Sequence, residues 1–594
     1  MQRTGRLTIV SLGLASCAAG LLTACGQTGT AAQAISADSL AKEIQVLASD
    51  SFGGRGPSSP GEERTINYMR DQFKQLGLAP GNGADWFQTV PLVKVTSDTT
   101  ALLVMSGRGK TVRLKFGDQF VAWSPRLQSH NELTQSDVVF VGYGVVAPEY
   151  QWNDYAGLDV RGKTVIILVN DPGWSGSDTT LFHGKTMTYY GRWTYKYEEA
   201  ARQGAAGAII VHETVPAAYP WGVVKNKGTG SQFWLQANDN NMTRCAIEGW
   251  MTVDAAKLLF RAADQDYDLL RTQADKRSFK AVPLRLRASV ALNTTLTRST
   301  SHNVLGVLKG TDHADEFVIY TAHWDHFGTD PGRTGDKIFN GARDNGTGSA
   351  GLLELARAFS RLGPQHRSVL FLSVTAEEQG LLGSLYYATH PVYPLNKTVA
   401  NINMDALNVW GRTKDITVIG FGNSELDDYM VQAAKDQGRS VRPDPEPEKG
   451  SYYRSDHFSF AKQGVPAIDP DGGVDNVEHG EAWQREQMDK YTSERYHQPS
   501  DQWDPTWNLS GMVEDLQLMF AVGARLAGEH NFPNWRAGNE FRALRDKMMG
   551  NAPPPAPASA APAAPEKAAP AKAAPAKAAP GKATKTKATK PKPR

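Results

Sequence analysis

The chain has 594 residues, which is enough for two or three domains with substantial cores. Hydrophobic residues make up 40% and charged residues 21%, an ordinary balance for a globular protein that excludes a mainly disordered chain. The formal net charge of +2 conceals an acidic body and a basic C-terminal tail. An acidic body argues against nucleic acid as the main partner.

The first 24 residues have the pattern of a secretory signal peptide. Arg3 and Arg6 form a positive segment before an apolar run at 7–22 that contains several small residues. The run ends in Leu22-Thr23-Ala24-Cys25, which resembles the bacterial lipobox. We therefore expect Cys25 to carry a lipid anchor, with 25–34 as a tether, in a cell-envelope lipoprotein on the periplasmic side or in the outer membrane. Leu14-Ala15-Ser16-Cys17 and an ordinary secretory signal are the alternatives.

Later parts of the chain add no second membrane signal. No segment after the signal reaches the roughly 20 apolar residues that a membrane helix needs. Besides Cys25, only Cys245 would remain as a thiol in the mature chain, so an internal disulfide framework is excluded. The core and any bound metals must supply the stability.

Two amphipathic helices are predicted within 35–135, the N-terminal part of the larger domain. Ser36 can cap a helix that runs to Leu47. Ile66, Met69 and Phe73 recur at helical spacing, and Gly77 can end that second helix.

The pattern changes over 136–290, where short Val/Ile-rich strands are predicted at 137–143, 162–170 and 206–211, with a helix at 195–203. Three stretches here, "FVGYG" at 140–144, "DVRGK" at 159–163 and "EEAARQGAAGAII" at 198–210, resemble the protease-associated domain that interrupts several peptidases. The resemblance implies a β-rich insertion that shapes access of substrate. The alternative is that this region is a continuous part of the surrounding fold.

Between His302 and about Gly528, strands and helices alternate, with apolar strands at 317–320, 369–374 and 399–403. This alternation predicts an α/β domain, 291–550, whose central mixed sheet is mainly parallel and flanked by helices. The Ala/Pro/Lys-rich tail, 551–594, has almost nothing to bury and is predicted to be disordered. Either it is a solvated extension or it binds anionic lipid or wall polymer.

Acidic and histidine side chains follow the predicted strands of this domain, at the end where open α/β sheets place their ligand sites. The clusters are His323-Trp324-Asp325-His326, Arg343-Asp344-Asn345, Glu377-Glu378, Asp405 and, much later, His497. A single histidine or glutamate pair of this kind carries little information, but five in this order carry a strong signal.

This set resembles the co-catalytic zinc aminopeptidase family, whose wider membership includes glutamate carboxypeptidases and glutaminyl cyclases. The stretches "LASD" at 47–50 and "GGRG" at 53–56 resemble members that carry the insertion. The resemblance implies two zinc ions per chain, one held by His323, Asp344 and Asp405, the other by Asp344, Glu378 and His497. Asp344 would bridge them. Nitrogen and carboxylate ligands suit zinc, although Mn or Co would also fit.

The same resemblance assigns three further roles. Glu377 would act as the general base that takes a proton from the attacking water. Asp325 would accept the second N–H of the His323 imidazole and fix its tautomer. Tyr452 would stabilise the oxyanion, with Tyr453 as the alternative. Ser455-Asp456-His457 is interpreted as support for the site, because adjacent residues are poorly placed to form the geometry of a catalytic triad.

The expected function is release of N-terminal residues from peptide substrates by a zinc metallopeptidase. Arg343, next to the bridging aspartate, and Ala406, after a ligand, depart from the usual family pattern without removing a ligand. A glutamate-carboxypeptidase-like or dipeptidase activity is the alternative, since Arg343 or Arg454 could bind substrate carboxylates. A non-catalytic binding protein on a peptidase scaffold is the alternative from another class.

Overall fold

The computed structural model describes residues 28–175, 178 and 180–551. The expected signal peptide, the Cys25 anchor and nearly all of the Ala/Pro/Lys-rich tail lie outside the described residues. Across the part that is described, none of the helices has both the length and the apolar character needed to span a membrane.

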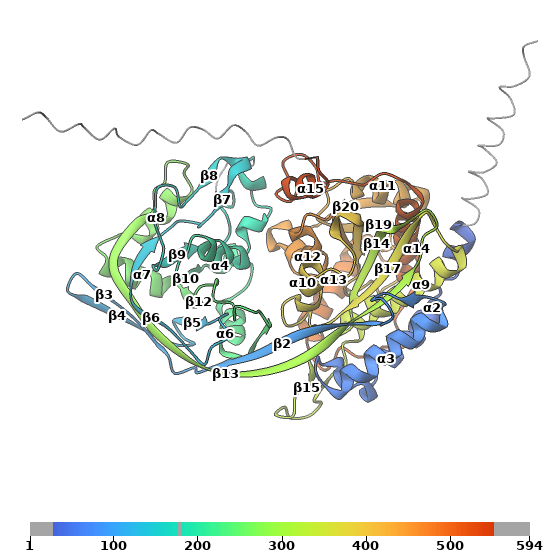
Figure 1. Cartoon of the computed structure of the whole chain (residues 1–594), viewed down its shortest axis with the longest axis horizontal. Helices are drawn as coiled ribbons and strands as arrows, with labels where there is room; N and C mark the ends of the chain where they lie inside the picture. Colours follow the sequence, from blue (N-terminus) through green and yellow to red (C-terminus); the bar gives the residue numbers. More distant parts are fainter. Residues whose placement is uncertain (1–27, 176–177, 179, 552–594) are drawn as a thin grey trace, which may run out of the picture.

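The chain folds into two domains that lie side by side (Figure 1). The large domain contains the N-terminal helices α2 (Ala37–Leu47) and α3 (Pro60–Gln75) and the chain from about 293 to 551. The inserted domain lies between them in sequence. The Ser36 side chain accepts the backbone N–H of Ser39 and caps α2, as predicted. Gly77 follows α3 with a φ of +82°, which suits a glycine beyond the end of a helix.

A mixed sheet forms the centre of the large domain. Its neighbouring strands, in spatial order, are β2 (Phe87–Ser97), β13 (Val282–Leu308), β17 (Arg367–Val374), β14 (His313–His323), β18 (Thr398–Asn403), β21 (Ala467–Gly472), β19 (Asp415–Ile419) and β20 (Ser440–Pro443). The four strands from β17 to β21 are parallel to one another, while β13 and β19 run antiparallel to their neighbours in this group. The predicted α/β domain with a mainly parallel sheet is confirmed.

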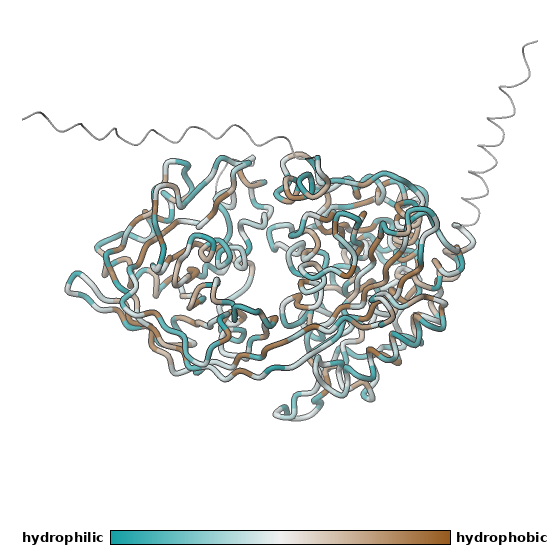
Figure 2. Tube along the Cα trace, viewed as in Figure 1, coloured by the Kyte–Doolittle hydropathy of each residue, from teal (hydrophilic) through white to brown (hydrophobic). Residues whose placement is uncertain are grey.

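Helices cover both faces of this sheet. Successive side chains of each apolar strand point to opposite faces and pack against the helices on both sides. In β14, Val318 and Tyr320 pack in the core that includes α2, α9 (Gly348–Leu362) and α14 (Ser510–Gly528). Phe317 and Ile319 pack in the core on the opposite face, next to α10 (Leu382–Thr389) and α12 (His457–Lys462). Burial on both faces explains why these strands are continuous apolar runs (Figure 2).

The inserted domain has its own sheet. Its strands are β3 (Leu102–Gly107), β4 (Lys110–Lys115), β5 (Phe120–Trp123), β6 (His130–Phe140), β9 (Thr164–Leu168), β10 (Gly207–His212), β12 (Ile247–Thr252) and the first part of β13. The series β6–β9–β10–β12 is parallel, and α4 (Trp193–Arg202) and α7 (Val253–Ala262) pack against it.

The domain boundary expected at 136 differs from the structure. It falls inside β6, and β3 to β5 already belong to this sheet through their pairing with β13 and β12. The inserted domain therefore starts near residue 98. Its strands before 136 were not separable from the large domain by composition, because strands of both domains share the same Val/Leu-rich pattern.

One long strand connects the two domains. β13 pairs first with β3 and β6 of the inserted domain, then with β2, and finally with β17 of the central sheet. Figure 1 shows β2 and β13 running together from one domain to the other. The expected boundary at 290 therefore lies within a continuous hydrogen-bonded ribbon and not in a loop.

Gly523 in α14 provides a test of the packing of this helix on the sheet. A Cβ at Gly523 would overlap the hydroxyl of Tyr320, which donates a 2.7 Å hydrogen bond to the Met519 carbonyl. We expect Gly523→Ala to lower the free energy of unfolding by about 1–3 kcal/mol, because overpacking outweighs the gain in helix propensity of about 1 kcal/mol.

The matched control is Gly222→Ala in α6 (Trp221–Thr229), where no atom lies within 4 Å of the new Cβ. Urea unfolding of both variants measures the difference. A Gly523→Ala protein as stable as the control would contradict the described packing of α14.

Candidate metal centre

The predicted ligands meet at the carboxyl ends of the parallel strands. His323 ends β14, Glu378 follows β17 and Asp405 follows β18. Asp344 lies in the turn before α9, and His497 lies beyond α13 (Gly480–Glu494). The structure thus brings together all five predicted metal ligands from five separate segments, at the edge of the sheet where the sequence placed them.

The first group of donors is formed by His323, Asp344 and Asp405. The Nε2 atom of His323 lies 3.2 Å from Asp405 Oδ1 and 3.4 Å from Asp344 Oδ1. The Nδ1 atom of the same ring lies 3.1 Å from the backbone carbonyl oxygen of Asp325. Because Nδ1–H donates to that carbonyl, Nε2 is the ring nitrogen directed at the acids and is the one that would bind a metal ion.

The second group uses the other oxygen of Asp344. His497 Nε2 lies 3.2 Å from Asp344 Oδ2 and 3.2 Å from Glu378 Oε2. Asp344 therefore faces one histidine with each of its carboxylate oxygens. This is the arrangement expected of a carboxylate shared by two cations.

His326 is a further donor at this position that the sequence interpretation did not assign. Its Nδ1 lies 2.6 Å from Glu378 Oε1, and it groups with Asp344 and Glu378 as a possible ligand set. Burial holds the pKa of His326 well below its ordinary value, so the ring is neutral. The signal in the sequence was the His323-x-x-His326 spacing directly after a strand.

Buried negative charge dominates the site. Burial, together with the negative charge of neighbouring acids, raises the pKa of Glu378 well above its ordinary value, and the same holds for Glu377. Four carboxylates that converge in a buried space need a compensating cation. The nitrogen and oxygen donors suit zinc, so both the chemistry and the positions of these residues fit a metal centre.

Arg55 is a buried cation whose guanidinium donates hydrogen bonds to backbone carbonyl oxygens. Its guanidinium donates to the carbonyl oxygens of Trp324 at 2.8 Å, Asn340 at 2.5 Å and Gly341 at 2.8 Å. These carbonyls belong to the two loops that carry His323 and Asp344. Arg55 thus holds both ligand-bearing loops at a fixed separation.

Asp501 holds the bridging residue in a similar way. Its two carboxylate oxygens accept the backbone N–H groups of Arg343 at 3.1 Å and Asp344 at 3.0 Å. The Tyr491 hydroxyl donates to the same carboxylate at 3.0 Å. The Arg343 guanidinium is stacked between the rings of Trp410 and Tyr491, with distances of 4.7 and 4.5 Å to the ring centroids.

Glu377, the predicted base, and Asp325 both lie next to the ligand candidate His323. Glu377 Oε2 is 3.9 Å from His323 Nε2. The Asp325 carboxylate accepts the backbone N–H of Glu377 at 3.0 Å, and lies 3.8 Å from His323 Nδ1. Asp325 therefore acts on His323 through its carbonyl, while its carboxylate positions Glu377.

The two tyrosines proposed for the oxyanion are not brought to the metal ligands. The Tyr452 hydroxyl donates to the Ala467 carbonyl at 3.0 Å, and the Tyr453 hydroxyl donates to Glu540 at 3.2 Å. Both side chains are buried. Ser455, in contrast, reaches the site and donates to Asp405 Oδ2 at 2.7 Å, which agrees with a supporting role for this segment.

Tyr496 is a tyrosine beside the ligands that the sequence interpretation did not assign. Its ring is stacked on the His497 ring with centroids 3.7 Å apart, and 43% of the residue is exposed. Partial burial beside His497 and the nearby Asp344 and Glu378 carboxylates raise the pKa of Tyr496 above its ordinary value, so the phenol keeps its proton. The available signal was its position directly before a ligand histidine.

Comparison with known proteins finds a match to one family profile and to proteins named as aminopeptidases. Residues 303–521 match the sequence profile described as Peptidase family M28. The chain is 27% identical over 227 residues to Aminopeptidase YwaD of Bacillus subtilis (strain 168), an alignment that covers 37% of this chain and 42% of that protein. It is 34% identical over 129 residues to Aminopeptidase NAALADL1 of Mus musculus, covering 21% and 16%. The chain thus spans less than half the length of these curated relatives.

Two solved structures are also similar. An aminopeptidase from Aneurinibacillus sp. strain AM-1 has a TM-score of 0.45 at 20% identity, covering 85% of this chain and 97% of the other. BSAP, a zinc aminopeptidase from Bacillus subtilis, has a TM-score of 0.39 at 18% identity, covering 85% and 99%. All five predicted metal ligands lie within the stretch 303–521 that matches the profile of Peptidase family M28.

Proposed function

We propose that this protein is a zinc-dependent aminopeptidase that binds two metal ions, with Asp344 as the shared ligand. The observation that carries the proposal is the use of both Asp344 oxygens, one toward His323 and one toward His497. The match of residues 303–521 to the profile of Peptidase family M28 and the curated relatives, which are named as aminopeptidases, support it.

His323 and Asp405 would complete the first metal site, and Glu378 and His497 the second. His497 is the better candidate for the second site than His326, because its Nε2 is 3.2 Å from a carboxylate oxygen of both Asp344 and Glu378. The His326 Nδ1 atom lies 2.6 Å from Glu378 Oε1, whereas its approach to a carboxylate oxygen of Asp344 is looser, within 4.8 Å. When bound, zinc would supply Lewis acidity toward water and toward the peptide carbonyl.

The side chains around the metals would move and hold protons. The Glu377 carboxylate would accept the proton of the attacking water and pass it to the leaving amine. Asp325 keeps Glu377 in position through its backbone N–H. The Tyr496 hydroxyl would donate a hydrogen bond to the carbonyl oxygen as that atom becomes negative.

Attachment to the cell envelope through a lipid on Cys25 also belongs to this proposal, as does the interpretation of the inserted domain as a protease-associated domain. The lipobox-like sequence supports the first, and the stretches at 140–144, 159–163 and 198–210 support the second. Peptides would be the substrates, and nucleic acid is not expected as a partner.

The first test measures metal content and activity together. We expect about two zinc ions per chain after reconstitution, and hydrolysis of aminoacyl nitroanilides by the wild-type protein. Glu377→Gln should keep both ions, because Glu377 is not a proposed ligand, and lose about 10²–10⁴-fold in kcat. Mass spectrometry of the metals and steady-state kinetics give the two readouts.

A wild-type protein without stoichiometric metal and without turnover would contradict the enzyme proposal and leave a binding protein. Bound metal with turnover only of N-blocked or C-terminal substrates would favour a carboxypeptidase.

The second test separates His497 from His326. His497→Ala should retain about one zinc ion per chain, because the second site loses its only nitrogen ligand. His326→Ala should retain about two, since it removes a neighbour of Glu378 and not a ligand. Metal content after dialysis against a weak chelator decides between them. Loss of one ion in His326→Ala, with two kept in His497→Ala, would reverse the assignment.

The third test concerns the oxyanion donor. Tyr496→Phe should lower kcat by about 10²–10³-fold with both metals retained, because one donor to the developing negative charge is lost. Tyr452→Phe is the matched control and should keep nearly the wild-type kcat, since its hydroxyl only reaches the Ala467 carbonyl. The opposite result for the two variants would return the role to Tyr452.

A further inference from the structure

Three histidine rings that the proposed function does not use lie against one another on the surface of the large domain. The centroid of the His530 ring is 4.9 Å from that of His313 and 5.2 Å from that of His366. The three residues come from segments that are far apart in the chain. Histidine is the commonest metal ligand in proteins, so three rings in contact form a candidate metal site. We call His313, His366 and His530 the surface histidine cluster.

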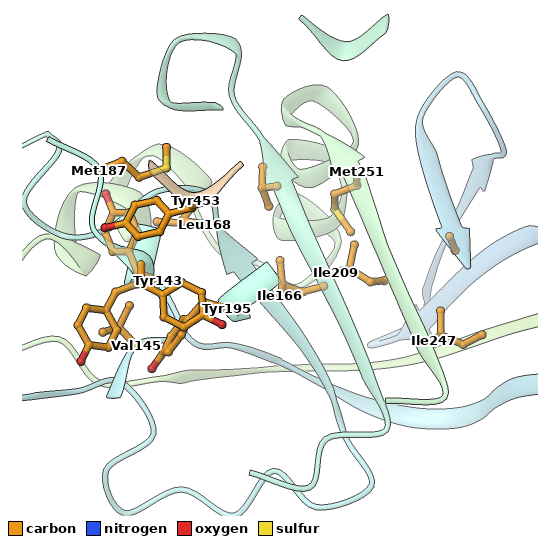
Figure 3. Close-up of a cluster of buried hydrophobic side chains, with 14 of the residues drawn as sticks. Tyr143, Val145, Ile166, Leu168, Met187, Tyr195, Ile209, Ile247, Met251 and Tyr453 are labelled. Atoms are coloured by element: carbon orange, nitrogen blue, oxygen red, sulfur yellow. The ribbon is translucent and has the colours of Figure 1, made fainter. Parts of the chain in front are cut away.

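The surface histidine cluster is remote from the metal centre. His313 is the first residue of β14, and the proposed zinc ligand His323 is its last. At about 3.3 Å per residue, the two ends of this strand are about 30 Å apart. The cluster also lies outside the apolar contact between the two domains, where Tyr453 packs with Met187 and Tyr195 (Figure 3). A ligand of the cluster is therefore separate from both of these places.

Hydrogen bonds fix the backbone of all three residues. The His313 N–H donates to the His366 carbonyl at 3.0 Å. The Arg367 side chain is fully buried, and its guanidinium donates to the Asn531 carbonyl at 3.0 Å, directly after His530. These contacts hold three separate segments at fixed positions, as a preorganised ligand site requires.

Carboxylates lie beside two of the rings and orient them. Asp312 Oδ1 accepts the His366 Nδ1–H at 2.7 Å, and Glu316 Oε1 lies 3.5 Å from His313 Nδ1. Because a carboxylate at Nδ1 accepts a proton from it, Nε2 is the nitrogen left to bind a metal ion. Histidine ligands in metalloproteins commonly have such a carboxylate at their other nitrogen.

The rings can turn toward a single ion. Of the His313 and His366 side chains, 39% and 47% are exposed, so their χ angles can change without disturbing the core. Imidazole nitrogens suit dications such as Zn²⁺, Ni²⁺ and Cu²⁺, and they do not suit Mg²⁺ or Ca²⁺. Three such nitrogens leave a fourth position of a tetrahedral ion to water.

We propose that the surface histidine cluster binds one transition-metal dication of the zinc, nickel or copper type, through one nitrogen of each ring. This site is additional to the two metal positions of the proposed function and does not depend on them. The ion joins the starts of β14 and β17 to the segment that follows α14. Because it is exposed and has three protein ligands, it dissociates during dialysis that leaves the metal centre loaded.

Zinc titration of the untagged wild-type protein, dialysed beforehand against a weak chelator, tests the proposal. Calorimetry should show one further binding event per chain. Native mass spectrometry should count one more zinc ion per chain than after dialysis. Ni²⁺ should bind in the same way, whereas Mg²⁺ should not, because it requires oxygen ligands.

The variant His530→Ala should lose this additional ion and keep the ions of the metal centre. Asp312→Asn should weaken binding of the additional ion by about 10–100-fold, because it removes the carboxylate that orients His366. His130→Ala is the matched control and should bind the ion like the wild-type protein. The His130 ring is also exposed and lies 3.5 Å from a carboxylate oxygen of Glu132, but among the described residues no second histidine ring contacts it.

Equal zinc binding by the wild-type protein and by His530→Ala would indicate an adventitious ion only and would overturn this inference. Absence of an additional ion in the wild-type protein would overturn it as well. Neither result bears on the proposed function, since His530→Ala should hydrolyse aminoacyl nitroanilides with the wild-type kcat/KM. A wild-type protein that binds the additional ion but has neither metal at the metal centre nor turnover would support this site and contradict the proposed function.

Discussion

The concentration of carboxylates around Asp344 is the constraint on which the rest of the structure depends. Asp344, Glu377, Glu378 and Asp405 approach one another in a space that excludes most of the solvent, so their mutual repulsion opposes folding unless cations are bound. The scaffold must hold these groups apart and in place without neutralising them. It does so through backbone hydrogen bonds: Arg55 binds carbonyl oxygens, and Asp501 binds N–H groups, of the loops that carry the ligands.

Because Arg55 binds backbone carbonyl oxygens, it does not compete with a metal ion for the carboxylate oxygens of the ligands. A guanidinium directed at Asp344 or Glu378 would form a charge-assisted pair and occupy the oxygens that a metal requires. Directed at Trp324, Asn340 and Gly341, the same group satisfies backbone acceptors that would otherwise be buried without a donor. The positive φ angles of Gly53 and Gly54, at 57° and 67°, allow the chain to turn so that Arg55 can point inward.

What the sequence could predict depends on whether a feature is set by a local pattern or by contacts between segments far apart in the chain. The ligands lie at the ends of apolar strands, and the apolar runs and the parallel arrangement fix those ends at one edge of the sheet. The five ligand candidates therefore lie together at this edge of the sheet, as the sequence interpretation expected. The Tyr452 side chain points away from the ligands because its hydroxyl donates to the carbonyl of Ala467, which lies on another strand. The sequence around a short turn does not reveal such a distant partner.

His326 and Tyr496 also lie beside the ligands, but the sequence interpretation did not assign them a role. Each is a neighbour of an assigned ligand, but adjacency alone does not tell whether a ring faces the site. The domain boundary at 136 was misplaced for a related reason. A strand's sheet is determined by its pairing partners, and β3 pairs with β13, almost two hundred residues later in the chain.

The connection between the two domains is a run of hydrogen-bonded strands and not a loop. β13 pairs with β6 and β3 of the inserted domain, then with β2, and finally with β17 of the central sheet. β11 (Gln232–Leu235) of the inserted domain also pairs with β2, and its Phe233 and Leu235 pack on a cluster that contains Ala376, the residue directly before Glu377. Because these pairings are continuous with the central sheet, they fix the inserted domain next to the turn that carries the proposed base.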